Sequence, residues 1–126
     1  MVVFTIITLI FEKVIGYTVL KGINRENAWA EIGMAIAEKE YRSHGYGTEA
    51  LHLTLNYAFT TLNLNTIYLT VFPENTRAVR LYEKLAFRKT GLIKKAWFMP
   101  DGTYSDLVKM ELTKDGFHRT GTNTPV

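Results

Sequence analysis

Two glycines, Gly45 and Gly47, separate an apolar strand pattern from a long amphipathic helix pattern, and both follow Arg42 closely. Glycine permits a positive φ and has no Cβ atom that would keep a ligand away from the backbone. The helix behind the pair begins with unpaired N–H groups and with the positive end of its dipole. The stretch therefore predicts a site for a phosphate or pyrophosphate, although a glycine pair before a helix is also typical of a simple tight turn.

Two common nucleotide-binding motifs match this stretch incompletely. The chain has no Gly-x-x-x-x-Gly-Lys-Ser/Thr sequence. Residues 45–50 do match Gly-x-Gly-x-x-Ala, but a dinucleotide fingerprint needs a strand that runs almost directly into the first glycine, within parallel βαβ units. The charged residues 38–42 intervene here, and the flanking strand patterns predict hairpins. A dinucleotide site is therefore disfavoured.

The composition is typical of a single globular domain. The chain has 126 residues, of which 47% are hydrophobic and 21% charged, and this length supports one core. It has no cysteine, and His44, His52 and His118 do not share metal-ligand spacing, so no metal site is expected. The net charge of +3 comes from scattered basic residues, which suits an anionic cofactor better than a nucleic acid.

Residues 1–10 are apolar but predict a strand rather than a targeting or membrane segment. They have no basic region in front of them and are too short to span a bilayer. We therefore expect a cytoplasmic protein with no membrane partner.

The remaining periodicities predict an α+β fold. They predict strands at 2–10, 14–20, 28–37, 66–72, 87–99 and 104–112, and helices at 48–64 and 75–85. A strand, a helix and another strand in succession imply one parallel pair with a right-handed crossover. We expect a mixed, mostly antiparallel twisted sheet flanked by helices, in a domain of residues 1–113 with a frayed tail over 114–126.

Two side chains stand out within these elements. Glu31 is an acid in an apolar strand, where it shares one face with Trp29 and Ala35. Such a carboxylate is either solvated at the edge of the sheet or a base at the site of a reaction. Tyr82 lies beside the apolar stripe of the 75–85 helix, where packing of its ring alone would explain it.

Two motifs, taken in order, resemble one protein family. The first is Arg42-x-x-Gly45-x-Gly47, and the second is Asn75-x-x-Ala78-x-x-Leu81-Tyr82-Glu83-Lys84-Leu85-Ala86-Phe87. With a strand between them, they resemble the GNAT family of acetyl-CoA-dependent N-acetyltransferases over residues 2–113. Residues 47–50 and 101–106 look most like the branch that acetylates ribosomal-protein N-termini and its relatives that act on polyamines or small amines.

This resemblance implies a role for each candidate residue. Backbone N–H groups would bind the pyrophosphate of acetyl-CoA in a loop made of Arg42, Ser43, His44, Gly45, Tyr46, Gly47 and Thr48. The pantetheine arm would pair with the strand end at Ile36 and Ala37 and would contact Asn75. Tyr82 would act as general acid toward the departing thiolate, and Glu31 would deprotonate the amine through a water molecule. The resemblance implies direct transfer without a metal.

The sequence departs from the family in two ways. Ala86 stands where the family usually has glycine, and the chain starts at what resembles the family's second strand. The strand and helices that shape half of the acceptor site are therefore expected to be missing. A non-catalytic acetyl-CoA-binding or assembly module is thus the alternative to an amine N-acetyltransferase. The open edge of the first strand also predicts a homodimer through Val3, Phe4, Ile6 and Ile7.

Overall fold

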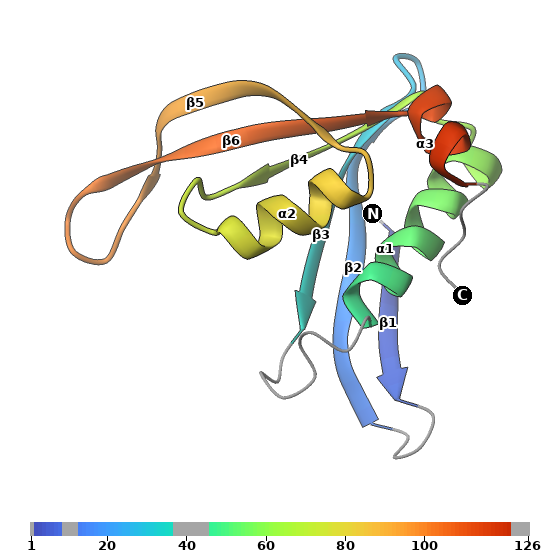
Figure 1. Cartoon of the computed structure of the whole chain (residues 1–126), viewed down its shortest axis with the longest axis horizontal. Coiled ribbons are helices and arrows are strands. Elements are labelled where there is room, and N and C mark those ends of the chain that lie inside the picture. Colours follow the sequence, from blue (N-terminus) through green and yellow to red (C-terminus); the bar gives the residue numbers. More distant parts are fainter. Residues whose placement is uncertain (1, 9–12, 37–45, 122–126) are drawn as a thin grey trace.

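The structure, a computed structural model, contains a six-stranded sheet with helices packed against it (Figure 1). It describes residues 2–8, 13–36 and 46–121. The strands are β1 Val2–Thr8, β2 Lys13–Asn24, β3 Trp29–Ile36, β4 Thr66–Val71, β5 Arg88–Phe98 and β6 Tyr104–Thr113. The helices are α1 Tyr46–Asn56, its π-helical continuation η2 Tyr57–Thr61, α2 Thr76–Lys84 and α3 Lys114–Gly121. Within these described ranges, no helix is long and apolar enough to cross a membrane.

The strand order is β1-β2-β3-β4-β6-β5, and every neighbouring pair is antiparallel except β3 with β4. The chain connects that parallel pair through α1 and η2, as the succession of strand, helix and strand predicts. The β5–β6 hairpin closes at the turn Pro100-Asp101-Gly102, where the Met99 N–H donates to the Thr103 carbonyl at 2.7 Å. The predicted mixed, mostly antiparallel α+β fold is confirmed.

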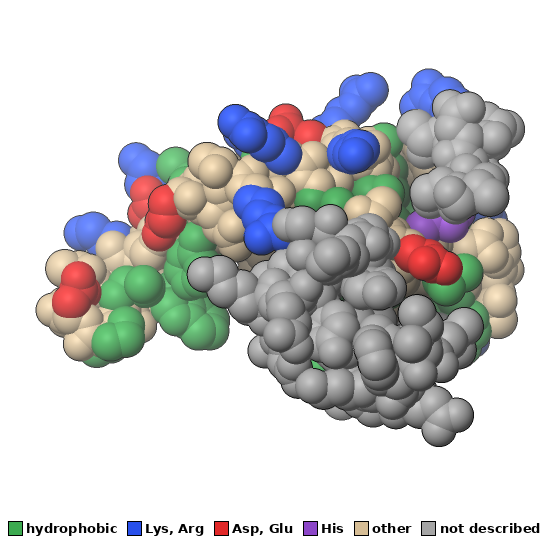
Figure 2. All heavy atoms as spheres, turned by 60° about the horizontal axis from the view of Figure 1, so that its bottom comes forward, with side chains coloured by type: hydrophobic (Ala, Val, Ile, Leu, Met, Phe, Trp, Pro, Cys, Tyr) green, Lys and Arg blue, Asp and Glu red, His purple; other side chains and the backbone are tan. Residues whose placement is uncertain are grey.

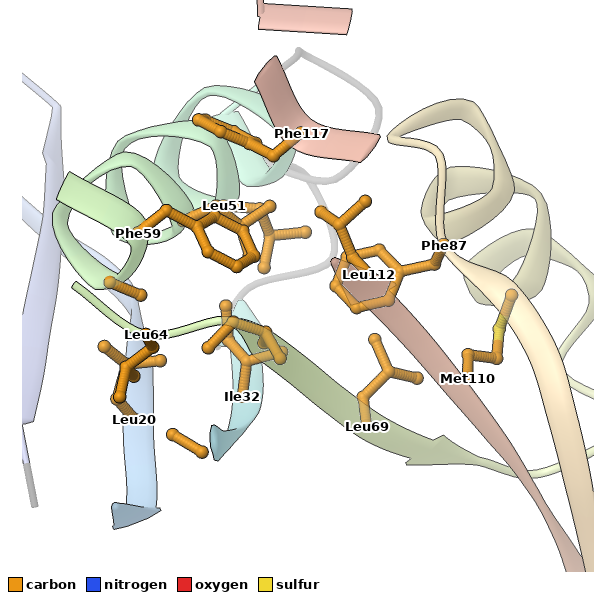
Figure 3. Close-up of a cluster of buried hydrophobic side chains, with 14 of the residues drawn as sticks. Leu20, Ile32, Leu51, Phe59, Leu64, Leu69, Phe87, Met110, Leu112 and Phe117 are labelled. Carbon is orange, nitrogen blue, oxygen red and sulfur yellow. The ribbon is translucent and has the colours of Figure 1, made fainter. Parts of the chain in front are cut away.

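Buried apolar side chains from the helices and from one face of the sheet form the core (Figure 3). The buried residues of α1 and η2 include Leu51, Leu55, Ala58 and Phe59. In β3, Ala30 and Ile32 are buried, whereas Trp29 is 45% exposed. Because successive side chains of a strand point to opposite faces, this alternation leaves Glu31 on the sheet face away from the core.

The helix predicted for 48–64 differs from the structure in its bounds and in its form. It begins earlier, at Tyr46, and its second half is the π-helical segment η2. There the Leu62 N–H donates to the Tyr57 carbonyl at 3.1 Å, five residues back, so the turn is wider than in an α-helix. Apolar spacing over so few residues does not distinguish the two kinds of turn.

The expectation of a frayed tail is wrong for α3. Phe117 is 4% exposed, and its ring centroid lies 5.2 Å from that of Phe59 and 5.4 Å from that of His52. The Lys114 N–H donates to the Asn65 carbonyl at 2.8 Å, which fixes the start of the helix against the loop before β4. Phe117 is the only large apolar residue in α3, so the sequence shows no stripe there, and the helix depends on tertiary packing.

The β5–β6 hairpin carries apolar side chains on its surface. Five large apolar residues of the hairpin are between 43% and 61% exposed: Leu92, Ile93, Trp97, Phe98 and Tyr104. In Figure 2, hydrophobic side chains gather at the left end of the molecule, the end to which the hairpin extends in Figure 1.

Candidate functional site

Strands β3 and β4 pair over a short stretch and then diverge. Their register partners are Trp29 with Thr66, Ala30 with Ile67, and Glu31 with Tyr68. Beyond this stretch, β3 stays paired with β2 as far as Ile36, while β4 stays paired with β6 as far as Val71. Among the described strands, the two facing edges have no further partner, and the strands spread apart (Figure 1). Unpaired backbone groups on such edges can bind an extended ligand as if it were another strand. We call this opening the β3–β4 splay.

The start of α1 provides part of the predicted anion site. Tyr46 is the first residue of α1, Gly47 is buried and Thr48 is half-buried. N–H groups in the first turn of a helix have no partner within the helix, so they are available to an anion. Of the residues predicted for the strand end, Ile36 is the last residue of β3. The remaining residues predicted for the cofactor loop and strand end lie outside the described residues: Ala37, Arg42, Ser43, His44 and Gly45. Their contacts stay predictions.

Asn75 is the N-cap of α2. Its Oδ1 accepts a hydrogen bond from the Ala78 N–H at 3.3 Å, the bond that an N-cap side chain makes with the first turn of a helix. Its contact with a pantetheine arm stays a prediction. The most buried residue of α2 is Val79, 7% exposed, whereas Ala78 and Leu81 are half-buried. A short helix at the edge of the core leaves its flanks open to solvent.

Tyr82 is half-buried near the end of α2. Its ring packs edge to face against that of Phe87, with the centroids 5.8 Å apart. Burial raises the pKa of the Tyr82 hydroxyl above its ordinary value of 10.0. The hydroxyl therefore keeps its proton at neutral pH, as a proton donor requires.

The turn after α2 holds Tyr82 and Phe87 together. The Phe87 N–H donates to the Tyr82 carbonyl, and the Ala86 N–H donates to the Glu83 carbonyl, both at 3.0 Å. Ala86 has a φ of 77°, the left-handed conformation in which many helices end and which glycine adopts most easily. The alanine at this position therefore holds a strained backbone conformation.

Glu31 lies at the narrow end of the β3–β4 splay, on the face away from the core. Its side chain is 25% exposed, and its Oε2 is 4.0 Å from the Nζ of Lys21. Its register partner is Tyr68. The pKa of Tyr68 is raised first by burial and then by the negative charge of Glu31. The negative charge of Glu31 therefore acts on the Tyr68 hydroxyl, in addition to burial.

The two predicted catalytic residues belong to opposite faces of the sheet. Tyr82 packs against the core, and Glu31 lies on the other face. A substrate that reaches both has to lie between the diverging strands. Within the part of the chain that the structure describes, no group of three or more His, Cys, Asp or Glu side chains could hold a metal ion.

The sequence reasoning missed Tyr68 and Lys109. The Nζ of Lys109 lies 4.9 Å from the centroid of the Tyr68 ring. Strand alternation over 66–72 places Tyr68 on the face of Glu31, so this residue could have been found. Lys109 could not, because its neighbour across the sheet depends on how β4 and β6 are paired.

Comparison with known proteins identifies a matching family model and relatives that are longer than this chain. The model of the acetyltransferase (GNAT) domain matches residues 2–88. A protein from Bacillus licheniformis, described as uncharacterized N-acetyltransferase p20, is 38% identical over 91 residues, or 72% of this chain and 51% of that protein. Spermidine N(1)-acetyltransferase from Vibrio cholerae is 34% identical over 106 residues, or 84% of this chain and 60% of that enzyme. The chain thus spans about half to three fifths of the length of these relatives.

A solved structure agrees with these sequence matches. The dodecameric structure of spermidine N-acetyltransferase from Vibrio cholerae in an intermediate state superposes with a TM-score of 0.79 at 33% identity. The superposition covers 85% of this chain and 61% of that chain.

Proposed function

Because the chain belongs to the GNAT family of acetyltransferases, we propose that it transfers the acetyl group of acetyl-CoA to the primary amine of a polyamine or another small amine. The β3–β4 splay carries this proposal, because it offers unpaired strand edges to a pantetheine arm, and the start of α1 offers N–H groups to a pyrophosphate. The spermidine acetyltransferase among the relatives supports a polyamine as the first acceptor to test.

Direct transfer needs two proton movements and a stabilised oxyanion. The amine nitrogen attacks the thioester carbon, so a C–N bond forms, the C–S bond breaks and CoA departs as a thiolate. Glu31 would take the amine proton through water, and the Tyr82 O–H would protonate the thiolate sulfur. A backbone N–H on the unpaired edge of β3 would stabilise the charge that develops on the carbonyl oxygen. Proton exchange with solvent then restores both side chains.

A thiol-release assay with acetyl-CoA and a panel of amines tests this proposal. We expect CoA release with spermidine or putrescine. Glu31→Gln should lower kcat/KM by roughly 10- to 1,000-fold, because the amine then lacks its base. Glu26→Gln, which removes an exposed carboxylate in the turn between β2 and β3, is the matched control and should change kcat/KM little. Binding of acetyl-CoA without CoA release from any amine would instead identify a non-catalytic acetyl-CoA-binding module.

We also infer that the chain forms a homo-oligomer through the edge of β1. This strand stands at one end of the strand order, and exposed strand edges pair readily with another chain. The dodecameric assembly of the solved relative supports self-association. Light scattering at micromolar concentration should show at least a dimer, and a stable monomer would contradict the inference.

A further inference from the structure

A row of polar side chains crosses the sheet face away from the core, with Tyr68 at its centre. Register partners place Lys21 beside Glu31, Glu31 beside Tyr68, and Tyr68 beside Glu111. Side chains that are directly opposite on neighbouring strands point to the same face, so these residues share one surface. The row passes the narrow end of the β3–β4 splay, where the proposed acceptor amine has to arrive.

An ammonium group already occupies the centre of this row. The Nζ of Lys109 lies 4.9 Å from the centroid of the Tyr68 ring, within the range of a cation–π contact. Lys109 and Glu111 are two residues apart on β6, so both lie on the face of Tyr68. The ring therefore offers an alkylammonium group a position between two carboxylates, those of Glu31 and Glu111.

Basic residues lie beside these two carboxylates on the sides that face away from Tyr68. On its outer side, Glu31 has the Lys21 ammonium at 4.0 Å, and Glu111 has Arg88 as its register partner on β5. A cross-strand ion pair such as that of Lys21 with Glu31 can stabilise a sheet on its own. On their inner sides, both carboxylates flank Tyr68. The backbones of Glu31 and Glu111 are two strand spacings apart, or about 10 Å, which suits a ligand with two separated cations.

We propose that Tyr68 and Glu111 form the subsite for the non-reacting ammonium group of a diamine or polyamine acceptor. That ammonium takes the place of the Lys109 ammonium over the Tyr68 ring, while the second nitrogen of the acceptor lies near Glu31 for acetylation. Lys109 then competes with the acceptor from within the same chain. The subsite rests on the proposed acetyltransferase function, because its second position is the site of that reaction.

Steady-state kinetics of the full chain with n-butylamine, putrescine and spermidine test the subsite. Lys109→Met removes the competing charge and keeps an unbranched side chain. It should lower KM for putrescine by about 2- to 30-fold, the range that a cation–π contact represents, and leave KM for acetyl-CoA unchanged. Lys94→Met, at an exposed lysine of β5, is the matched control and should change neither constant. Glu111→Gln should raise KM for putrescine but not for n-butylamine.

The outcomes separate this inference from the proposed function. If wild type acetylates amines but Lys109→Met leaves KM for putrescine unchanged or raises it, the subsite is wrong and the acetyltransferase function stands. An equal effect of Glu111→Gln on putrescine and n-butylamine also overturns it. If no amine is acetylated, calorimetry with putrescine decides: tighter binding to Lys109→Met than to wild type supports the subsite, and equal or undetectable binding rejects it.

Discussion

The hydroxyl groups of Thr18 and Thr54 form a buried hydrogen bond, 2.6 Å long, that joins β2 to α1. The Thr54 hydroxyl also donates to the Ala50 carbonyl at 2.7 Å. Because a hydroxyl has one proton, Thr18 is the donor in the bond to Thr54. Both side chains are at most 1% exposed, so neither hydroxyl can turn to water instead.

Because Thr18 is the donor, replacing Thr18 and replacing Thr54 should change the free energy of unfolding by different amounts. Thr54→Val leaves the Thr18 O–H buried without an acceptor and should lower the free energy of unfolding by about 1–3 kcal/mol. Thr18→Val should cost less, because Thr54 still donates to Ala50. The double variant should lose less than the sum of the two single losses, since the unpaired donor is removed as well. Urea denaturation measures all three, and equal losses in the single variants would contradict the assigned donor.

Ala86→Gly should stabilise the protein. The φ of 77° at Ala86 costs an L-residue roughly 1–2 kcal/mol, and glycine adopts it freely. The greater freedom of glycine in the unfolded chain offsets part of this gain, so we expect a net increase of up to about 1 kcal/mol. Ala78→Gly makes the same change inside α2 and should instead destabilise by about 1 kcal/mol. Thermal unfolding of the two variants shows whether each gains or loses stability. A loss of stability in Ala86→Gly would contradict the strain assigned to Ala86.

Tyr82→Phe should separate catalysis from binding. The ring keeps its contact with Phe87, while the proton donor to the thiolate is lost. We expect kcat to fall by roughly 10- to 1,000-fold with little change in the affinity for CoA. Turnover equal to wild type on a good acceptor would leave Tyr82 with a packing role only.

The same variant should change stability at alkaline pH. Below pH 10, both the folded and the unfolded chain hold the Tyr82 proton, since burial raises the folded pKa above 10.0. Above about pH 10 the unfolded chain loses the proton first, so the free energy of unfolding falls as pH rises through the folded pKa. Tyr82→Phe removes this dependence and should lose less stability than wild type over that interval. Tyr68 also has a raised pKa, so Tyr82→Phe should still lose some stability at alkaline pH. Urea denaturation at a series of pH values measures both losses.

Gly47→Val should abolish the thermal stabilisation of the protein by acetyl-CoA. Gly47 is buried in the first turn of α1, and a branched side chain there blocks access to the N–H groups. Wild type should gain RT ln(1 + [L]/Kd) from the ligand. Gly91→Ala, whose new Cβ would meet the Cβ of Lys109 at an ordinary 4.0 Å, is the control and should keep the full shift. Circular dichroism shows whether Gly47→Val is folded, and a folded variant with an unchanged shift would remove the pyrophosphate assignment.

Local rules explain which parts of the molecule the sequence predicts well. Strand alternation separates Ala30 and Ile32 from Glu31, because it depends only on near neighbours in the chain. These rules were enough for the order of the elements and for the buried faces of α1 and β3.

Features that depend on distant pairing were not predictable in this way. Lys109 contacts Tyr68 because β4 and β6 are neighbours in the sheet, although α2 and β5 lie between them in the chain. A shift of one residue in that register would send every side chain to the other face, and no local pattern specifies it. α3 depends in the same way on Phe117 reaching Phe59.

The short parallel contact divides the sheet into two leaves, β1-β2-β3 and β4-β6-β5. In the part of the chain that the structure describes, β3 and β4 share three register pairs, and core side chains from both leaves, such as Ile32 and Leu69, belong to one buried cluster. A ligand that forms backbone hydrogen bonds with both facing edges acts as a clamp between the leaves. Its binding therefore slows amide hydrogen exchange in both leaves together, including in strands that it never touches.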